Sequence, residues 1–118
     1  MALVSALAVG VGGAIGAVTR YAVSLAVERR SLDTFVVNVS GSLLIGVVLG
    51  SDIGGPIALG LAVGFCGAFT TFSSFAVETV RLAEDEYRVA AVFYAVGTLV
   101  AALVAVLAGF AVAGSNAV

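Results

Sequence analysis

The chain alternates four long apolar stretches with short polar connections. The apolar stretches cover residues 2–27, 34–50, 56–80 and 89–113. A helix needs about 20 residues to cross about 30 Å of hydrocarbon. Three of the stretches are long enough, and the second must sit upright or use interfacial residues. The pattern predicts one all-α domain over residues 1–118, built from four transmembrane helices.

Composition agrees with a membrane protein. Of the 118 residues, 62% are hydrophobic and 10% are charged, whereas a soluble domain has about 45–50% apolar and about 25% charged residues. We therefore expect a multi-pass protein of the cell membrane, in contact with lipid and not with nucleic acid. The chain has no histidine and a single cysteine, so it offers few candidates for a catalytic base or a transition-metal ligand. We do not expect an enzyme.

The basic residues are all arginines, and they are distributed unevenly. Arg29, Arg30, Arg81 and Arg88 lie in the first and third connections, and the termini and the second connection have none. The positive-inside rule therefore predicts that the first and third connections are cytoplasmic and that both termini lie outside.

Small residues recur at a spacing of four, which allows helix backbones to approach closely. Such stripes serve either packing inside one subunit or contact between subunits, and the sequence leaves both open. Four helices enclose too little space for a pore, so we expect an oligomer. The stripes are Gly12/Gly16, Gly13/Ala17, Ser42/Gly46/Gly50 and Ala105/Gly109/Ala113.

The third stretch contains polar residues at the depth where they are most costly. Its midpoint is near Ala68, which places Gly67, Thr70 and Thr71 close to the bilayer midplane. Glycine and threonine weaken a helix, and a break here would free carbonyl oxygens that suit a hard cation such as Na⁺. The alternative is an ordinary helix in which the hydroxyls bond back to the preceding turn.

Aromatic and polar side chains follow this segment at helical spacing. Phe72 and Phe75 share a face, next to a second stripe made of Phe65, Phe69 and Phe72. The rings either pack or use their positive edges to hold a dehydrated anion without trapping it. A polar stripe beside the rings either lines a polar path or bonds to a neighbouring helix. Its members are Thr71, Ser74 and Glu78.

The other stretches contain isolated polar groups. Asn38 lies about one turn into the second stretch and offers either an interhelical hydrogen bond or an anion contact. Tyr94 and Thr98 place two hydroxyls on one face of the fourth helix. Arg20 either extends toward the first connection or pairs with a carboxylate such as Glu78, and we favour a structural or vestibule role for it.

These segments together resemble the Fluc/CrcB family of fluoride channels. The resemblance covers all four stretches, and its most specific part is the Thr-Thr-Phe-Ser-Ser-Phe segment in the third stretch. The segments that carry it are residues 13–21 (GAIGAVTRY), residues 37–42 (VNVSGS) and residues 64–75 (GFCGAFTTFSSF), continuing to Glu78.

The resemblance implies a passive, fluoride-selective channel that relieves fluoride toxicity. It implies a broken third helix and an antiparallel dimer with two pores. It further implies a structural Na⁺ at the dimer centre, not transported and held by the backbone carbonyls of Gly67 and Thr70 from both subunits. The implied pore residues are Asn38, Phe72 and Phe75, the implied polar track is Thr71, Ser74, Glu78, Tyr94 and Thr98, and Arg20 corresponds to the first-helix arginine of the family.

The uneven arginines conflict with insertion in both orientations. We therefore hypothesise a fixed orientation and an oppositely oriented homologue as the second subunit, with a homodimer as the alternative. Two other functions stay open. One is a small multidrug-resistance-type proton-coupled exporter, whose first-helix acid this chain lacks. The other is a non-transporting membrane assembly subunit, against which the polar groups at mid-depth argue.

Overall fold

The computed structural model describes residues 2–116, and its regular elements over that range are all helices. Four segments are long and apolar enough to cross a membrane. These segments are Ala2–Ala26, Ser31–Gly50, Gly55–Glu84 and Arg88–Gly114. The prediction of an all-helical, multi-pass membrane protein is confirmed.

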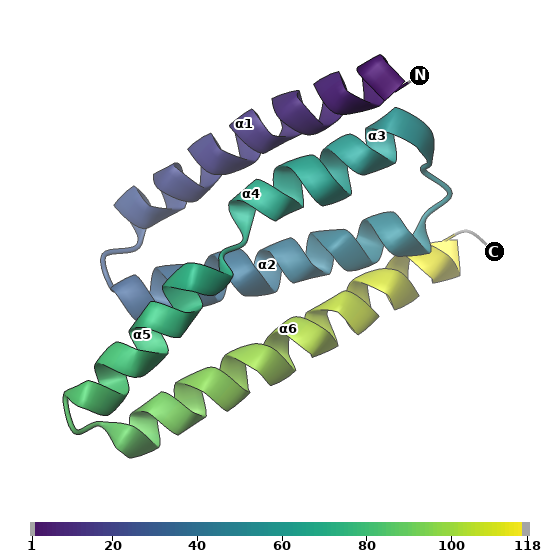
Figure 1. Ribbon diagram of the computed structural model, residues 1–118. Helices are drawn as coiled ribbons and strands as arrows, with labels where there is room; N and C mark the ends of the chain where they lie inside the picture. Colours follow the sequence, from purple (N-terminus) through teal and green to yellow (C-terminus); the bar gives the residue numbers. More distant parts are fainter. Residues whose placement is uncertain (1, 117–118) are drawn as a thin grey trace.

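Consecutive spans run in opposite directions (Figure 1). The connection between the first two spans and the one between the last two lie at the same end of the molecule, and both described chain ends lie at the other end. The elements are α1 (Ala2–Ala26), α2 (Arg30–Gly50), α3 (Gly55–Leu59), the π-helix η1 (Gly60–Cys66), α4 (Gly67–Phe69), α5 (Phe72–Glu84) and α6 (Arg88–Asn116).

Two predicted boundaries are wrong by about one turn. The second span begins at Arg30 rather than at residue 34, and the third continues to Glu84 rather than ending at residue 80. Asp33 lies in the first turn of α2, and Arg81 lies in the last turn of α5. A carboxylate at a helix N-terminus and a cation at a C-terminus both interact favourably with the helix dipole. Part of each charged connection therefore belongs to the helices, and α2 reaches 21 residues.

The third span changes its packing partner along its length. Its first part, from α3 to α4, packs against α1, whereas α5 packs chiefly against α6 (Figure 1). The remaining large contact is between α2 and α6. The change of partner falls at Thr70 and Thr71, which belong to neither α4 nor α5.

The small-residue stripes pack inside the subunit. A Cβ atom added at Gly12 or Gly16 would overlap the backbone of η1, and one added at Gly46 or Gly109 would overlap the backbone of the facing helix in the α2–α6 pair. Since these positions admit only a hydrogen atom, they let the helix axes approach closely. Of the two uses that the sequence left open, these glycines serve packing within one chain.

Candidate functional site

Two residues with extended backbone separate α4 from α5. Thr70 has φ −83° and ψ 160°, and Thr71 has φ −149° and ψ 115°. Gly67 keeps helical angles of −60° and −36°, so the glycine does not mark the interruption. The Thr70 hydroxyl donates to the carbonyl of Cys66 at 2.8 Å. It therefore bonds back to the preceding turn even though the helix does not continue.

The Asn38 side chain, from α2, bonds to the backbone of this interruption. Its Nδ2 donates to the carbonyl oxygen of Thr71 at 3.0 Å, and its Oδ1 accepts from the Thr71 N–H at 2.7 Å. The Thr71 hydroxyl oxygen then accepts from the Ser74 N–H at 3.1 Å and caps α5. Asn38 thus makes the interhelical hydrogen bond that was one of its two predicted uses.

These bonds replace two that a continuous helix would make. In such a helix the Thr71 N–H would donate to the carbonyl of Gly67, and the Ser74 N–H to the carbonyl of Thr70. Both donors are used elsewhere, so these two carbonyls lose their helical partners. Carbonyl oxygens are ligands for hard cations. Within residues 2–116, no group of three or more His, Cys, Asp or Glu side chains is placed to hold a metal.

A cleft of about 250 Å³ adjoins the interruption on one side. The rings of Phe72 and Phe75 lie 5.8 Å apart between centroids, and Phe75 lies 5.6 Å from the ring of Tyr94. The cleft thus brings the predicted pore residues together with Thr98 of the fourth span. The lining consists of Asn38, Ser42, Ile45, Thr70, Thr71, Phe72, Phe75, Thr98, Leu99 and Ala102. We call this space the aromatic cleft.

One predicted aromatic stripe does not continue through the interruption. Phe65 and Phe69 stack with their centroids 5.3 Å apart, and Phe69 is 7% exposed. Phe72 is 79% exposed and contacts Phe75 instead. The two extended residues change the helical phase, so the spacing of i, i+4 and i+7 no longer places the three rings on one face.

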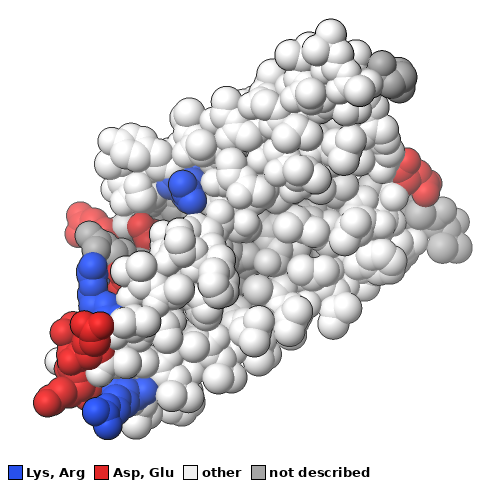
Figure 2. Space-filling model, viewed as in Figure 1, with Lys and Arg blue, Asp and Glu red and all other residues white. Residues whose placement is uncertain are grey.

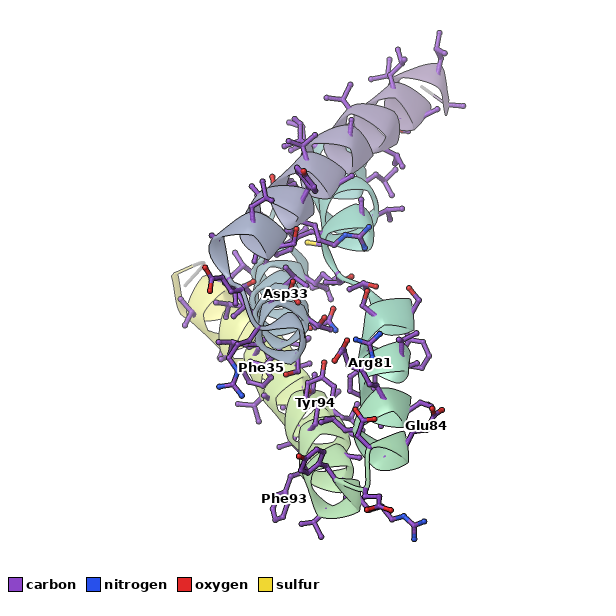
Figure 3. All side chains as sticks on the ribbon, turned by 90° about the vertical axis from the view of Figure 1, so that its left-hand side faces the viewer. Asp33, Phe35, Arg81, Glu84, Phe93 and Tyr94 are labelled. Carbon is purple, nitrogen blue, oxygen red and sulfur yellow. The ribbon has the colours of Figure 1, made fainter. Side chains whose placement is uncertain are left out.

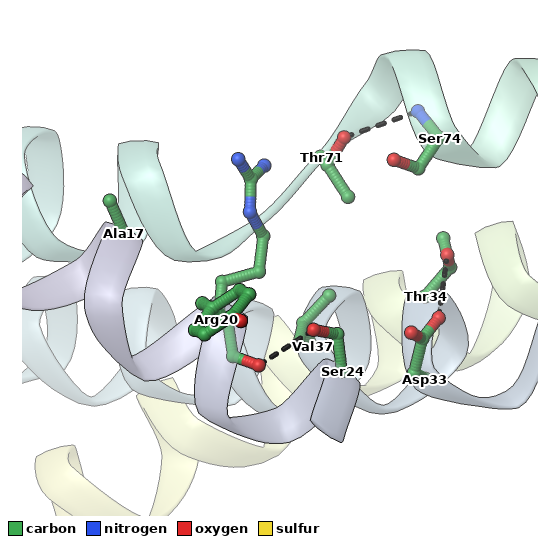
Figure 4. Close-up of a pocket in the computed structure, with 9 residues that line it drawn as sticks. Ala17, Arg20, Ser24, Asp33, Thr34, Val37, Thr71 and Ser74 are labelled. Atoms are coloured by element: carbon green, nitrogen blue, oxygen red, sulfur yellow. Dashed lines mark hydrogen bonds between the residues drawn. The ribbon is translucent and has the colours of Figure 1, made fainter. Parts of the chain in front are cut away.

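Arg20 lines a second cavity, of about 260 Å³, between α1, α2 and the interruption. Its guanidinium points from α1 toward the extended connection (Figure 4). Asp33 and Thr34 enter from α2, and Thr71 and Ser74 from the third span. The carboxylate in this cavity belongs to Asp33. Arg20 therefore lies beside Thr71 and Ser74 of the predicted polar stripe.

Glu78 lies farther along α5 and is 6% exposed. Its carboxylate forms an ion pair with Arg81 at 3.7 Å. It lines a third cavity, of about 360 Å³, together with Asp33, Thr34 and Ser74. Two members of the predicted stripe, Ser74 and Glu78, thus face a different space from the phenylalanine rings.

The fourth span contributes Tyr94 and Thr98. The Tyr94 side chain points from α6 into the space between α6 and α5, toward which Arg81 also points (Figure 3). Thr98 is 4% exposed, and its hydroxyl has no hydrogen-bond partner among the described residues. Buried hydroxyls are normally paired. The Thr98 hydroxyl therefore lies in the lining of the aromatic cleft with its hydrogen-bonding capacity unused among the described residues.

Sequence reasoning missed two polar residues of α2. Thr34 is 3% exposed and lines both cavities that contain Asp33, to whose Oδ1 its hydroxyl donates at 3.2 Å. Ser42 lines the aromatic cleft and donates to the carbonyl of Asn38 at 2.7 Å. Both lie four residues from Asn38, and this spacing puts all three on one helix face. That periodicity was the signal that would have found them.

The charged side chains gather at one end of the molecule. Figure 2 shows basic and acidic atoms together at the end with the α1–α2 and α5–α6 connections, and only acidic atoms at the opposite end. Arg29 and Arg88 belong to the first end, and Asp52 lies in the connection at the other. The uneven loop charge of the sequence is thus a difference between the two ends of the fold.

The profile of the family described as CrcB-like protein, Camphor Resistance (CrcB), matches residues 7–110. A protein of Natronomonas pharaonis named fluoride-specific ion channel FluC 2 is 68% identical over 111 residues, covering 94% of this chain and 96% of that protein. Proteins of the same name from Haloarcula marismortui and Rhodococcus jostii are 47% and 41% identical. They match 90% and 88% of this chain and are themselves covered to 91% and 94%.

Proposed function

The chain belongs to the CrcB-like protein family, and on that premise we propose that it is a fluoride-selective channel through which fluoride leaves the cell passively. Such a channel reduces fluoride toxicity and needs no catalytic group. The observation that carries the proposal is the aromatic cleft, where an amide, hydroxyls and two phenyl rings meet at mid-span in an otherwise apolar protein.

The chemistry of the aromatic cleft suits a small, strongly hydrated anion. As water leaves, the anion needs replacement donors, and conduction needs each site to be weak enough to release it. Asn38 Nδ2 has two hydrogens, of which Thr71 takes one. The second hydrogen, the Thr98 hydroxyl and the positive edges of the Phe72 and Phe75 rings are moderate, neutral donors. A cationic side chain among them would hold the anion more tightly.

We further propose a structural Na⁺ that is not transported. The carbonyls of Gly67 and Thr70 would hold it, because both have lost their helical hydrogen-bond donors. Two carbonyls are too few for a hard cation, which prefers about six oxygen ligands. A second subunit would add two more, and solvent or hydroxyl oxygens would add the rest. Gly67 is exposed on α4, which leaves it accessible to such a subunit.

The second subunit that we propose is an oppositely oriented homologue. An antiparallel pair has its twofold axis in the membrane plane, which fits carbonyls near the middle of the third span. The arginine-bearing end of the fold favours one orientation for this chain. A reporter fused to the C-terminus tests this, with the outside as the expected location. Substantial populations on both sides of the membrane would instead favour a homodimer.

Fluoride efflux from liposomes tests the channel itself. The purified protein, reconstituted with and without a homologous partner, should release fluoride and retain chloride. Absence of fluoride flux in both preparations would overturn the proposal. Equal release of the two anions would overturn the selectivity that we assign to the aromatic cleft.

A further inference from the structure

We propose that one turn of α2, from Asn38 to Gly41, is a seat that holds the interruption of the third span in shape. We call this turn the α2 seat. In this proposal Asn38 is a positioning residue that acts on the third-span backbone, besides any contact with an anion. The effect on Na⁺ and fluoride rests on the proposed function, whereas the effect on the backbone does not.

The first half of the seat is the Asn38 amide. One oxygen and one N–H of this amide bond to the N–H and the carbonyl of the same residue, Thr71. A neutral amide side chain supplies a donor and an acceptor in one plane. Thr71 is 8% exposed, and unpaired backbone groups at this depth are costly. Asn38 therefore supplies the bonds that let Thr71 leave the helix.

The second half of the seat is Gly41, three residues farther along α2 and on the same face. Gly41 is buried, and a Cβ atom there would overlap the Cγ2 methyl of Thr70 and lie 3.3 Å from Cδ2 of Phe69. Thr70 is a short, β-branched side chain whose hydroxyl bonds to the Cys66 carbonyl at 2.8 Å. It cannot rotate away without losing that bond. Gly41 therefore leaves the space that the Thr70 methyl occupies.

The two halves hold adjacent residues. Asn38 holds Thr71, and Gly41 admits Thr70, so the seat determines the direction of the Thr70 carbonyl and withholds the Thr71 N–H from the Gly67 carbonyl. Asn38 also lines the aromatic cleft. One turn of α2 therefore links the carbonyls proposed for Na⁺ to the pore proposed for fluoride.

A double-mutant cycle tests the Gly41 half, because Thr70→Ser removes the methyl that Gly41→Ala would strike and keeps the hydroxyl. For each of the four proteins, we measure the Na⁺ concentration that gives half of the maximal Na⁺-dependent increase in the thermal stability of the dimer. We expect Gly41→Ala to raise this concentration about tenfold, which corresponds to about 1.4 kcal/mol. Adding Thr70→Ser should recover most of that loss. If Gly41→Ala does not fold, recovery of folded dimer by Thr70→Ser is the supporting result.

Gly46→Ala is the matched control on the same helix. A Cβ atom at Gly46 would overlap the backbone of Val106 in α6, away from the third span. It should lower stability without any recovery by Thr70→Ser. The proposal for Gly41 would be overturned if adding Thr70→Ser restored both alanine variants, or if it restored neither of them.

Hydrogen–deuterium exchange tests the Asn38 half without Na⁺ or fluoride. We compare Asn38→Leu, which removes both bonds to Thr71, with Thr98→Val, which changes the same cleft without touching the interruption. Exchange in the peptide containing residues 70–74 should be about tenfold faster in Asn38→Leu only, the size expected for losing a buried hydrogen bond. Equal exchange rates for this peptide in the two variants would overturn the proposal that Asn38 holds the interruption in shape. A wild-type protein that carries no fluoride but shows the expected exchange would overturn the proposed function alone.

Discussion

The two halves of the third span differ in how they contact the rest of the molecule: the first packs closely against a helix, and the second borders cavities. From Gly55 to Phe69 the chain packs backbone to backbone against α1, and a Cβ atom at Gly64 would lie 2.6 Å from the carbonyl oxygen of Val9. From Phe72 to Glu84 it stands away from α2, and its polar residues line cavities. The first half is in close contact with α1, whereas the second half faces cavities lined by polar side chains.

The difference shows how a small membrane protein combines rigidity with a polar path. Contact between backbones stabilises helices in lipid without a hydrophobic driving force, and it needs small residues. Polar side chains at depth need space and partners. The interruption at Thr70 and Thr71 lets one span do both, because it turns the chain from α1 toward α6. Four predictions test this comparison.

The largest effect is expected where backbones touch. Gly64→Val should cost about 3 kcal/mol or more of unfolding free energy, because a Cβ atom and its two methyl groups would enter the α1 contact. The measurement is thermal unfolding in detergent, with recovery of monodisperse protein. Gly97→Val is the control, since among residues 2–116 no atom beyond its own stretch of helix lies within 4 Å of a Cβ atom there. Equal loss in both variants would contradict the close contact.

In the second half, a large effect on flux is expected with little effect on folding. Phe72→Ala should lower fluoride flux about tenfold or more, because a contact with an anion is worth about 1.5–3 kcal/mol. Stability should change little, since Phe72 is 79% exposed. Phe93→Ala is the control. That ring is 74% exposed and points away from α5 (Figure 3), so unchanged flux is expected, and a matching loss would contradict the role of the aromatic cleft.

Removal of Na⁺ tests the boundary between the halves. Replacing Na⁺ by N-methylglucamine should lower both dimer stability and fluoride flux. When the free Na⁺ concentration is 100 times the dissociation constant, binding contributes about 2.7 kcal/mol to stability. The dimer fraction is measured by cross-linking, and helix content is followed by circular dichroism as a control for unfolding. If neither the dimer fraction nor the fluoride flux depends on Na⁺, the proposal of a structural Na⁺ is wrong.

The smallest effect is expected for a single hydroxyl. Thr98→Val keeps the shape of the side chain and removes a buried hydroxyl without a partner in residues 2–116. Flux should fall a few fold, while stability stays the same or rises by about 1 kcal/mol. Thr19→Val is the control, because its hydroxyl donates to the Ile15 carbonyl at 2.7 Å and lies outside the cleft. A strong loss of stability in Thr98→Val would contradict an unpaired hydroxyl.

Much of the site was visible in the sequence because it is local. Phe72 and Phe75 are three residues apart, and a helix of any fold places them on one face. The hydroxyl of Thr70 bonds back within its own turn. The fixed φ of proline suits the first turn of a helix, and α3 begins with Pro56 in its first turn. Local spacing did not predict that η1 is a π-helix, nor that its Gly60 and Gly64 lie against the backbone of α1.

The sequence alone determined that the chain spans a membrane, how many spans it has and which connections contain the arginines, because these follow from apolar length and from the order of charged residues along the chain. Tertiary structure decided what the mid-depth polar groups do. Asn38 and Thr71 are 33 residues apart in the chain, and no spacing rule joins them. Whether a helix continues or breaks at a threonine depends on a partner for its backbone groups, and here α2 supplies that partner.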